Sequence, residues 1–131
     1  MPLSIDIFRP DRIVIGVARG RLTVSDMQDF YDNLEATNTL NYRKIIDIFA
    51  ATTEMRKKDV AAFAAWLRTK FRKRPAGAIA IVTDQRGAEL AQLFASLISE
   101  DQPSRVFQNI RDAREWLRQI TTIELPSARD P

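Results

Sequence analysis

The side chains available for chemistry are acids, hydroxyls and basic groups, because the 131 residues include no histidine and no cysteine. These absences exclude a Ser-His-Asp triad, a cysteine nucleophile, a disulfide framework and a zinc site made of thiolates or imidazoles. Among the acids, Asp47 interrupts an otherwise apolar stretch at residues 45–49. A carboxylate buried there would have a raised pKa and could serve as a general acid or base. Because no second carboxylate stands at a recognisable spacing, we favour the alternative that Asp47 accepts hydrogen bonds from loop backbone.

Two short segments, residues 49–54 and 83–87, combine hydroxyls with small residues. They supply five candidate ligand-binding or phospho-acceptor side chains: Thr52, Thr53, Thr83, Asp84 and Arg86. Each segment follows a predicted strand and precedes a predicted helix, the place where open α/β sheets bind ligands. Backbone N–H groups at a helix start can hold a phosphate or carboxylate, and the Arg86 guanidinium would add a forked donor. No glycine-rich phosphate motif accompanies them, so we favour the alternative that Thr53 and Asp84 cap the following helices.

The net charge of +3 is distributed unevenly along the chain. Residues 24–40 carry four acids and no basic residue, whereas residues 55–74 carry eight basic residues against one acid. On a helical wheel Trp66 falls close to Lys70 and Lys73, and these three side chains form a candidate partner surface. The alternative is a solvated basic face on which Trp66 packs against lysine stems. Nucleic acid is disfavoured as a partner because no further aromatic and basic platform accompanies Trp66, whereas a protein or a membrane surface stays open.

The hydrophobic pattern alternates strands with helices. Strands are predicted at residues 3–8, 13–18, 44–49, 78–82 and 104–107, the second being apolar enough to be covered on both faces. Helices are predicted from Ser25, which has Gln28 at the capping-box spacing, over residues 56–73, after the segment 83–87, and from Asn109 to about residue 120. The order β-β-α-β-α-β-α-β-α predicts an α/β fold: a mostly parallel sheet that starts with an antiparallel hairpin and is packed with helices.

A chain of this length forms one domain, which we place at residues 1–120. Residues 121–131 lack periodicity and contain two prolines, so we expect a flexible tail there.

The order of elements resembles the STAS domain, and more closely its SpoIIAA-like group, also described as STAS/SEC14-like. The stretches that carry the resemblance are residues 45–48, 78–84 and 105–117, and together with the element order it covers residues 3–120. In STAS anti-anti-sigma factors an Asp-Ser-Ser-Gly stretch carries a phosphorylated serine. The corresponding residues here, 51–55, keep hydroxyls in Thr52 and Thr53 but not that frame. The resemblance implies a domain that regulates or binds and does not catalyse.

Three functions are therefore open. The first is a non-enzymatic regulatory or protein-interaction domain, with a protein partner or as a homodimer in which the acidic first helix docks on the basic second helix of another copy. The alternative is a carrier or sensor that binds a small anionic or apolar ligand at the two loops. An enzyme that uses Asp47 or Asp84 ranks last, and no cofactor or metal is expected.

The expected location is the cytoplasm. The apolar runs are far shorter than the ~18 residues that a membrane span needs. The N-terminus also lacks a basic segment followed by an apolar one, which a signal peptide would show. We therefore expect no membrane span and at most a weak association with a membrane surface.

Overall fold

The computed structural model describes residues 3–72 and 76–128, with side chains as far as residue 120 in the last helix. The elements follow the predicted order: β1 (Leu3–Phe8), β2 (Ile13–Arg21), α1 (Val24–Ala36), β3 (Arg43–Thr52), α2 (Lys57–Lys70), β4 (Ile79–Val82), α3 (Gln85–Ile98), β5 (Ser104–Phe107) and α4 (Ile110–Ala128). The strands form one sheet in the order β1-β2-β3-β4-β5. The β1-β2 pair is antiparallel and the other pairs are parallel, so the predicted α/β fold is confirmed.

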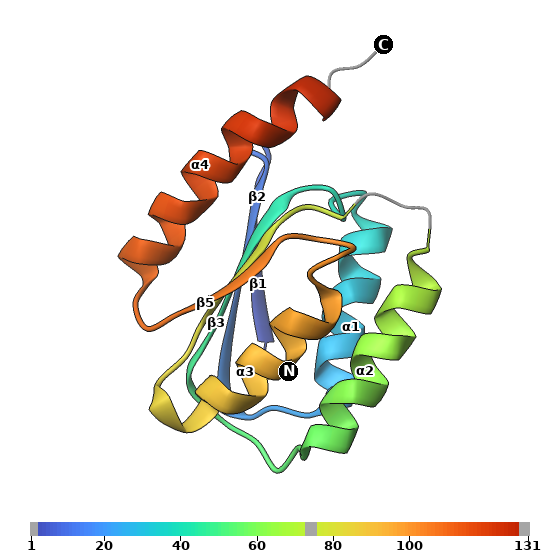
Figure 1. The fold of residues 1–131 in the computed structure, drawn as a ribbon, viewed down its shortest axis with the longest axis vertical. Coiled ribbons are helices and arrows are strands. Elements are labelled where there is room, and N and C mark those ends of the chain that lie inside the picture. Colours follow the sequence, from blue (N-terminus) through green and yellow to red (C-terminus); the bar gives the residue numbers. More distant parts are fainter. Residues whose placement is uncertain (1–2, 73–75, 129–131) are drawn as a thin grey trace.

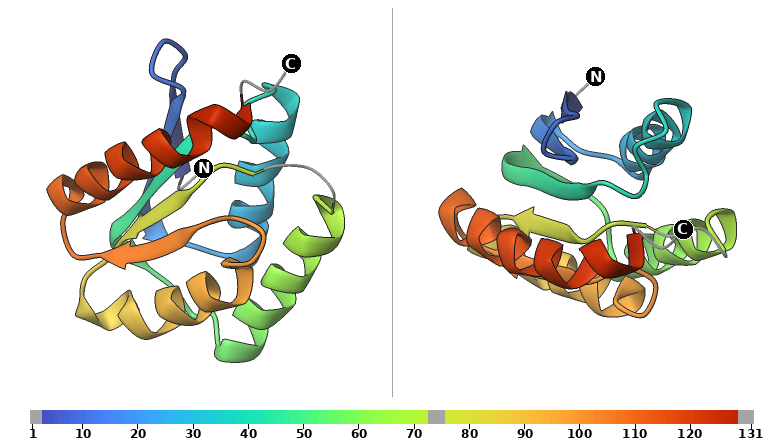
Figure 2. Two further views of the ribbon diagram at one scale, coloured as in Figure 1. Left: turned by 45° about the horizontal axis from the view of Figure 1, so that its top comes forward. Right: turned by 90° about the horizontal axis from the view of Figure 1, so that it is seen from above.

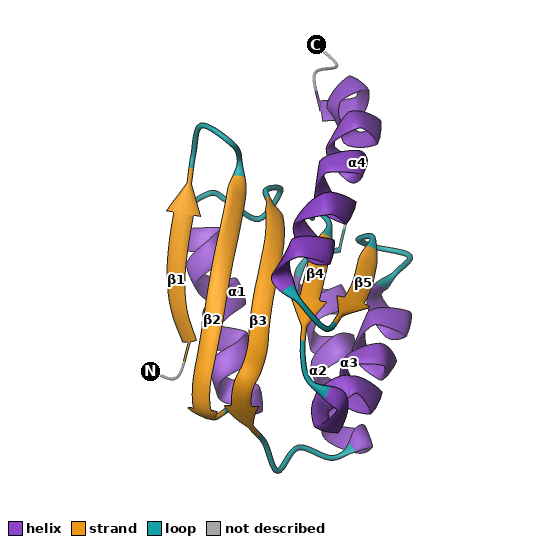
Figure 3. Ribbon diagram, turned by 90° about the vertical axis from the view of Figure 1, so that its left-hand side faces the viewer, coloured by secondary structure: helices purple, strands orange, loops and turns teal. Residues whose placement is uncertain are grey.

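The two faces of the sheet are covered unequally (Figures 1 and 3). Helices α1, α2 and α3 pack on one face, where α2 and α3 also lie against each other (Figure 2). Helix α4 lies alone on the other face, over β3, β4 and β5. Alternation along β3 sends Ile46 into the core under the three helices and Ile45 into the smaller core under α4.

The expectation that β2 is covered on both faces is wrong. Val14 on its inner face is fully buried, but Ile13 and Ile15 on the outer face are only partly buried. The reason is that α4 packs on β3–β5 and leaves the outer face of the β1-β2 hairpin without a helix (Figure 3).

Several helix boundaries also differ from the prediction: α2 ends at Lys70, and α3 begins at Gln85, within the segment 83–87. Helix α1 begins earlier, because Thr23 and not Ser25 is its N-cap: the Thr23 hydroxyl accepts from the Asp26 N–H, and the Asp26 carboxylate accepts from the Thr23 N–H. Helix α4 continues to Ala128, beyond the predicted end near residue 120. Flexibility of the tail from residue 121 stays a prediction, and residues 129–131 lie outside the described part of the chain.

A lysine buried inside the sheet layer fixes the amino ends of β3 and β4. The side chain of Lys44 is fully buried, and its Nζ donates to the carbonyl oxygens of Leu40 at 2.8 Å, Tyr42 at 3.0 Å and Gly77 at 3.1 Å. These carbonyls belong to the loop before β3 and to the segment before β4. At Gly77 a Cβ atom would overlap the carbonyl oxygens of Tyr42 and Asn41, so only glycine permits this approach.

We expect Lys44→Met to lower the free energy of unfolding by about 3 kcal/mol, because the carbonyl groups of Tyr42 and Gly77 lose the Lys44 donor and Leu40 keeps only the Gly77 N–H. Urea unfolding followed by circular dichroism measures the change. Lys58→Met, at an exposed position of α2, is the matched control and should change stability little. Equal stability of the two variants would contradict the role given to Lys44.

Candidate functional site

The two loops singled out in the sequence lie side by side at the carboxyl ends of β3 and β4. Between them is a hollow of about 250 Å³, here called the loop hollow, whose lining includes Thr52, Thr53, Thr83, Asp84 and Arg86. An inner cavity of about 90 Å³ adjoins it underneath α2 and α3, and its walls are almost entirely apolar. Both spaces share five lining residues: Leu22, Ile48, Thr53, Gly87 and Leu90. The arrangement is an apolar chamber with a polar rim, as in many small-molecule sites.

The loop between β3 and α2 is held by hydrogen bonds of Thr53. Its hydroxyl donates to the carbonyl oxygen of Leu22 at 2.7 Å and accepts from the N–H of Met55 at 3.1 Å. The expectation that Thr53 caps α2 is wrong, because Arg56 occupies the N-cap position and its N–H donates to the Asp59 carboxylate at 2.9 Å. Thr53 instead joins this loop to the end of β2. Thr52 is exposed at the rim.

The loop between β4 and α3 is closed by a tight contact between Thr83 and Gly87. Thr83 is buried, and its hydroxyl donates to the carbonyl oxygen of Asp84 at 3.2 Å. A Cβ atom at Gly87, in the first turn of α3, would overlap the Thr83 hydroxyl, so a larger residue there would require the Thr83 side chain to move. Asp84 caps α3 as predicted, since its carboxylate accepts from the Gly87 N–H at 3.2 Å.

The charges at the rim are already paired. The Arg86 guanidinium donates through Nε at 3.0 Å and Nη2 at 2.9 Å to one carboxylate oxygen of Asp84. This hydrogen bond from Arg86 is the largest cause that holds the pKa of Asp84 below its ordinary value. An anion arriving at the start of α3 would have to displace Asp84 both from Arg86 and from the Gly87 N–H. The rim therefore favours a ligand held mainly by its apolar part.

Asp47 does not face the loop hollow. Its neighbours Ile46 and Ile48 line the inner cavity, so alternation along β3 places the Asp47 side chain on the opposite face of the sheet. There it is half-buried, and its carboxylate accepts from the Phe49 N–H at 3.0 Å. Asp47 thus accepts from the main chain as expected, but the N–H belongs to β3 itself and not to a loop.

The candidate partner surface on α2 is engaged within the chain. Trp66 stacks on Phe63 with ring centroids 5.7 Å apart, and Lys70 Nζ lies 5.3 Å from the centre of the Trp66 ring. Lys70 also pairs with two acids of α1, Asp32 at 3.0 Å and Glu35 at 3.5 Å.

The hydrogen bond to Asp32 is the first cause of the raised pKa of Lys70. Lys73 lies outside the described residues. A partner role for Trp66, Lys70 and Lys73 stays a prediction.

The sequence analysis missed an apolar surface on the sheet. The outer face of β1, β2 and the end of β3 is here called the bare strip. It presents five apolar side chains, Phe8, Ile13, Ile15, Val17 and Phe49, and between them the polar residues Ser4, Asp6 and Asp47. Phe8 is 45% and Phe49 48% exposed, which is high for aromatic residues. The two-sided apolar pattern of β2 was the available signal, but it was interpreted as full burial.

The described residues include neither an acidic metal cluster nor a membrane-spanning helix. No group of three or more acids among them could hold a metal ion. No helix within the described ranges is long and apolar enough to cross a membrane.

A family model and a solved structure similar to this chain carry the same description, SpoIIAA-like. A family model described as SpoIIAA-like matches residues 13–118. Among solved structures, the chain is similar to an uncharacterized protein of the DUF3478 family with a SpoIIAA-like fold, from Shewanella loihica PV-4, at 21% sequence identity and a TM-score of 0.56. The similarity covers 88% of this chain and 91% of that one. No curated protein sequence gives a significant match.

The lowered pKa of Asp84 predicts that its contribution to stability depends on pH. Because the pKa of Asp84 is lowered in the folded state, its stabilising effect is present above the unfolded-state pKa and is lost as the pH falls through the folded value. We expect Asp84→Ala to lower the urea midpoint at neutral pH, and the difference from wild type to vanish at strongly acidic pH. The variant Arg86→Ala keeps the hydrogen bond from the Gly87 N–H to Asp84, so its urea midpoint should fall less. A difference that does not change with pH would contradict the assignment.

Proposed function

Because this chain belongs to the SpoIIAA-like family, we propose that it is a non-enzymatic binding domain whose main site takes the apolar part of an amphiphilic small molecule. The observation that carries this proposal is the apolar inner cavity adjoining the loop hollow at the carboxyl ends of β3 and β4. Sites of this kind in open α/β sheets receive ligands from the direction of the loops.

The inner cavity offers apolar contacts and little else. Met55, Val60 and Phe63 form part of its wall on one side, and Leu90 and Phe94 on the side of α3. Each methylene group moved from water into such surroundings contributes about 0.8 kcal/mol. A short alkyl chain or a ring edge is therefore the part of a ligand that this cavity would hold.

The polar groups of the loop hollow support binding better than turnover. The Thr53 and Thr83 hydroxyls both donate to main-chain carbonyl oxygens, and Asp84 accepts from Gly87 and Arg86. None of these three side chains is placed beside a described base that could activate it. The exposed Thr52 and Arg86 are left at the rim, where the polar head of an amphiphile would lie.

We expect decanoate and decanol to bind, and Met55→Trp to weaken both by at least about tenfold, because filling the inner cavity excludes two or more methylene groups. Arg86→Ala should weaken decanoate alone, because it leaves the Asp84 carboxylate unpaired at the rim, where it repels an anionic head group. Isothermal titration calorimetry with the intact chain measures the affinities. Met55 is a half-buried loop residue, so the larger side chain should be accommodated without loss of the fold.

The matched control for this experiment is Ile110→Trp, at an exposed position on α4. It adds the same ring away from the two loops and should leave both affinities unchanged. Failure of both compounds to bind the wild-type chain, or equal binding by Met55→Trp, would contradict the proposed site.

A second candidate function, protein recognition, is favoured by the bare strip. Three strands about 4.8 Å apart span about 10 Å, the width of one helix with its side chains. The strip lies beside α4 on the same face, so one more helix there would complete the layer (Figure 3). A helix that covers Ile13, Ile15 and Val17 must be apolar on the side that faces the sheet.

The charges beside the strip indicate which charges a partner helix would carry. A groove of about 430 Å³ between the strip and α4 has Phe8, Ile13 and Ile15 in its lining, with Arg43, Arg114 and Arg118 around them. Asp11 is the one acid among the residues that line this groove, and Arg118 also pairs with Glu115 at 2.9 Å, which leaves Arg43 and Arg114 as the remaining positive charges. Opposite charges across an interface favour association and fix its orientation. The partner proposed here is therefore an amphipathic helix with acidic flanks.

The homodimer expected from the sequence is less well supported in its predicted form. It required the acidic α1 of one copy to dock on the basic α2 of another. Within the chain, Lys70 of α2 already pairs with Asp32 and Glu35 of α1, which reduces the charge available for such a contact. A dimer formed through the bare strip is a different arrangement, and it is one outcome of the following experiment.

We expect a synthetic helical peptide with leucines on one face and glutamates on both flanks to bind, and its twin with lysines in place of glutamates to bind at least about tenfold more weakly. The double variant Arg114→Glu/Arg118→Glu should reverse that preference. Fluorescence anisotropy measures the binding. The control, Lys58→Glu/Arg72→Glu, makes the same charge change at exposed positions of α2 and beyond its end.

Three results of this experiment would count against an acidic partner helix. The first is equal binding of the two peptides, and the second is an unchanged preference in the Arg114/Arg118 variant. The third is that light scattering shows a dimer in the absence of peptide and that Ile15→Asp abolishes this dimer. A second copy of the chain, and not an acidic helix, would then occupy the strip.

A further inference from the structure

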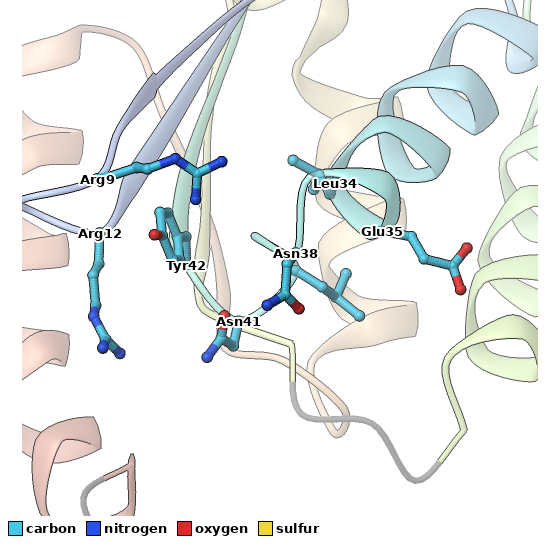
Figure 4. A pocket seen from close by; sticks show the side chains of 8 residues that line it. Arg9, Arg12, Leu34, Glu35, Asn38, Asn41 and Tyr42 are labelled. Atoms are coloured by element: carbon cyan, nitrogen blue, oxygen red, sulfur yellow. The ribbon is translucent and has the colours of Figure 1, made fainter.

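A second polar hollow lies at the opposite end of the sheet from the loop hollow. It measures about 450 Å³ and lies between the β1-β2 turn and the loop that joins α1 to β3. We call it the hairpin hollow; its polar lining comprises Arg9, Arg12, Asn38, Asn41 and Tyr42, with Glu35 at one side (Figure 4). Its volume falls within the range of small-ligand sites. Neither the loop hollow nor the bare strip includes these five residues.

The frame of the hairpin hollow is held firmly by two basic residues of β3. Lys44 Nζ donates to the carbonyl oxygens of Leu40 and Tyr42, which fixes the loop on one side. Arg43 fixes the turn on the other side: its Nη2 donates to the Asp11 carbonyl oxygen at 2.6 Å, and its N–H donates to the Arg12 carbonyl oxygen at 3.2 Å. The groups that line the hollow are thus carried by backbone that is already ordered, which lowers the entropy lost on binding.

The two arginines stand at the two ends of one turn. The Arg12 N–H donates to the Arg9 carbonyl oxygen at 3.2 Å, which closes a turn with the two residues at its ends. The Cα atoms at the two ends of such a turn lie within about 7 Å of each other. The Arg9 guanidinium is directed into the hollow, with a long hydrogen bond of 3.4 Å to the Thr37 carbonyl oxygen, whereas the Arg12 side chain extends along the wall away from Arg9 (Figure 4). A ligand that contacts both groups therefore requires the exposed Arg12 side chain to turn toward Arg9. Within the described part of the chain, neither guanidinium forms an ion pair with a carboxylate.

The backbone at Arg12 has an unfavourable conformation for a residue with a side chain. Its φ is +54°, in the left-handed region where glycine would fit without strain. Asn38 also has a positive φ, but asparagine after a helix end commonly adopts that conformation. An arginine in this strained conformation is consistent with a role for its guanidinium.

The charges around the hollow favour an anion. The carboxylate of Glu35 is directed away from the hollow (Figure 4) and pairs with Lys70 at 3.5 Å. The carboxyl end of α1 lies at the hollow and carries about half a negative charge. The carbonyls of Asn33, Leu34 and Glu35 in that end already accept main-chain N–H groups. Two full positive charges therefore outweigh the helix end.

We propose that the hairpin hollow binds the phosphate group of a small, hydroxyl-bearing phosphate monoester. Arg9 and Arg12 present guanidinium groups, whose forked donors suit phosphate oxygens. Asn38, Asn41 and Tyr42 supply amide and phenol groups that can donate to and accept from ligand hydroxyls. An apolar amphiphile does not fit here because the walls are mainly polar, so this ligand class differs from the one assigned to the loop hollow.

Ribose 5-phosphate, ribose and sulfate are the probes that test this proposal, by isothermal titration calorimetry on the intact chain at fixed ionic strength. We expect ribose 5-phosphate to bind at least tenfold more tightly than either ribose or sulfate. Arg9→Ala should reduce its affinity at least tenfold, and Tyr42→Phe should reduce it severalfold. The control, Lys57→Ala/Lys58→Ala, removes two positive charges from the start of α2 and should leave the affinity unchanged.

The variant Arg12→Gly distinguishes a role of Arg12 in binding from a role in stabilising the fold. Glycine relieves the positive φ, so this variant should unfold at a higher urea concentration than wild type, while its affinity for ribose 5-phosphate falls at least tenfold. Three outcomes would overturn the proposal: sulfate binding as tightly as ribose 5-phosphate, the Lys57/Lys58 control losing as much affinity as Arg9→Ala, or Arg12→Gly binding like wild type.

Discussion

The buried ammonium group of Lys44 is the interaction on which one end of the molecule depends. A charged group inside the core is stabilised only if its donors are satisfied, and here three main-chain carbonyl groups satisfy them. These carbonyls come from the segments that precede β3 and β4, which the close approach at Gly77 brings together. The same contacts shape one wall of the hairpin hollow. Stability and a binding surface therefore rest on one side chain.

The two ends of the sheet differ in the residues that hold their loops and line their hollows. At the carboxyl ends of β3 and β4, the polar side chains Thr53, Thr83 and Asp84 bond to the loops themselves, and apolar residues beneath them leave a cavity. At the amino end of β3, Lys44 and Arg43 bond to the loops, and polar side chains face solvent around a hollow. The first end thus suits the apolar part of a ligand, and the second suits an anion.

The uneven covering of the sheet follows from the number of helices. Three helices pack on one face, where acidic α1 and basic α2 also neutralise part of each other's charge through Lys70. The single helix α4 can cover β3 to β5 but not β1 and β2. The apolar residues of β2 that remain outside are consistent with recognition of a further helix, whereas the charged pair α1–α2 is already engaged.

The order of elements, the α/β class and the SpoIIAA-like family could be predicted from the sequence, because hydrophobic period and turn residues are local signals. The Asp84 cap and the position of the two loops were predictable for the same reason. Three features were decided only by the tertiary structure: the burial of Lys44, the bare outer face of β2, and the pairing of Lys70 with α1. Each depends on which segments distant in the chain come to lie side by side. A basic residue has the same sequence pattern whether it faces water, a carbonyl cluster or a neighbouring acidic helix.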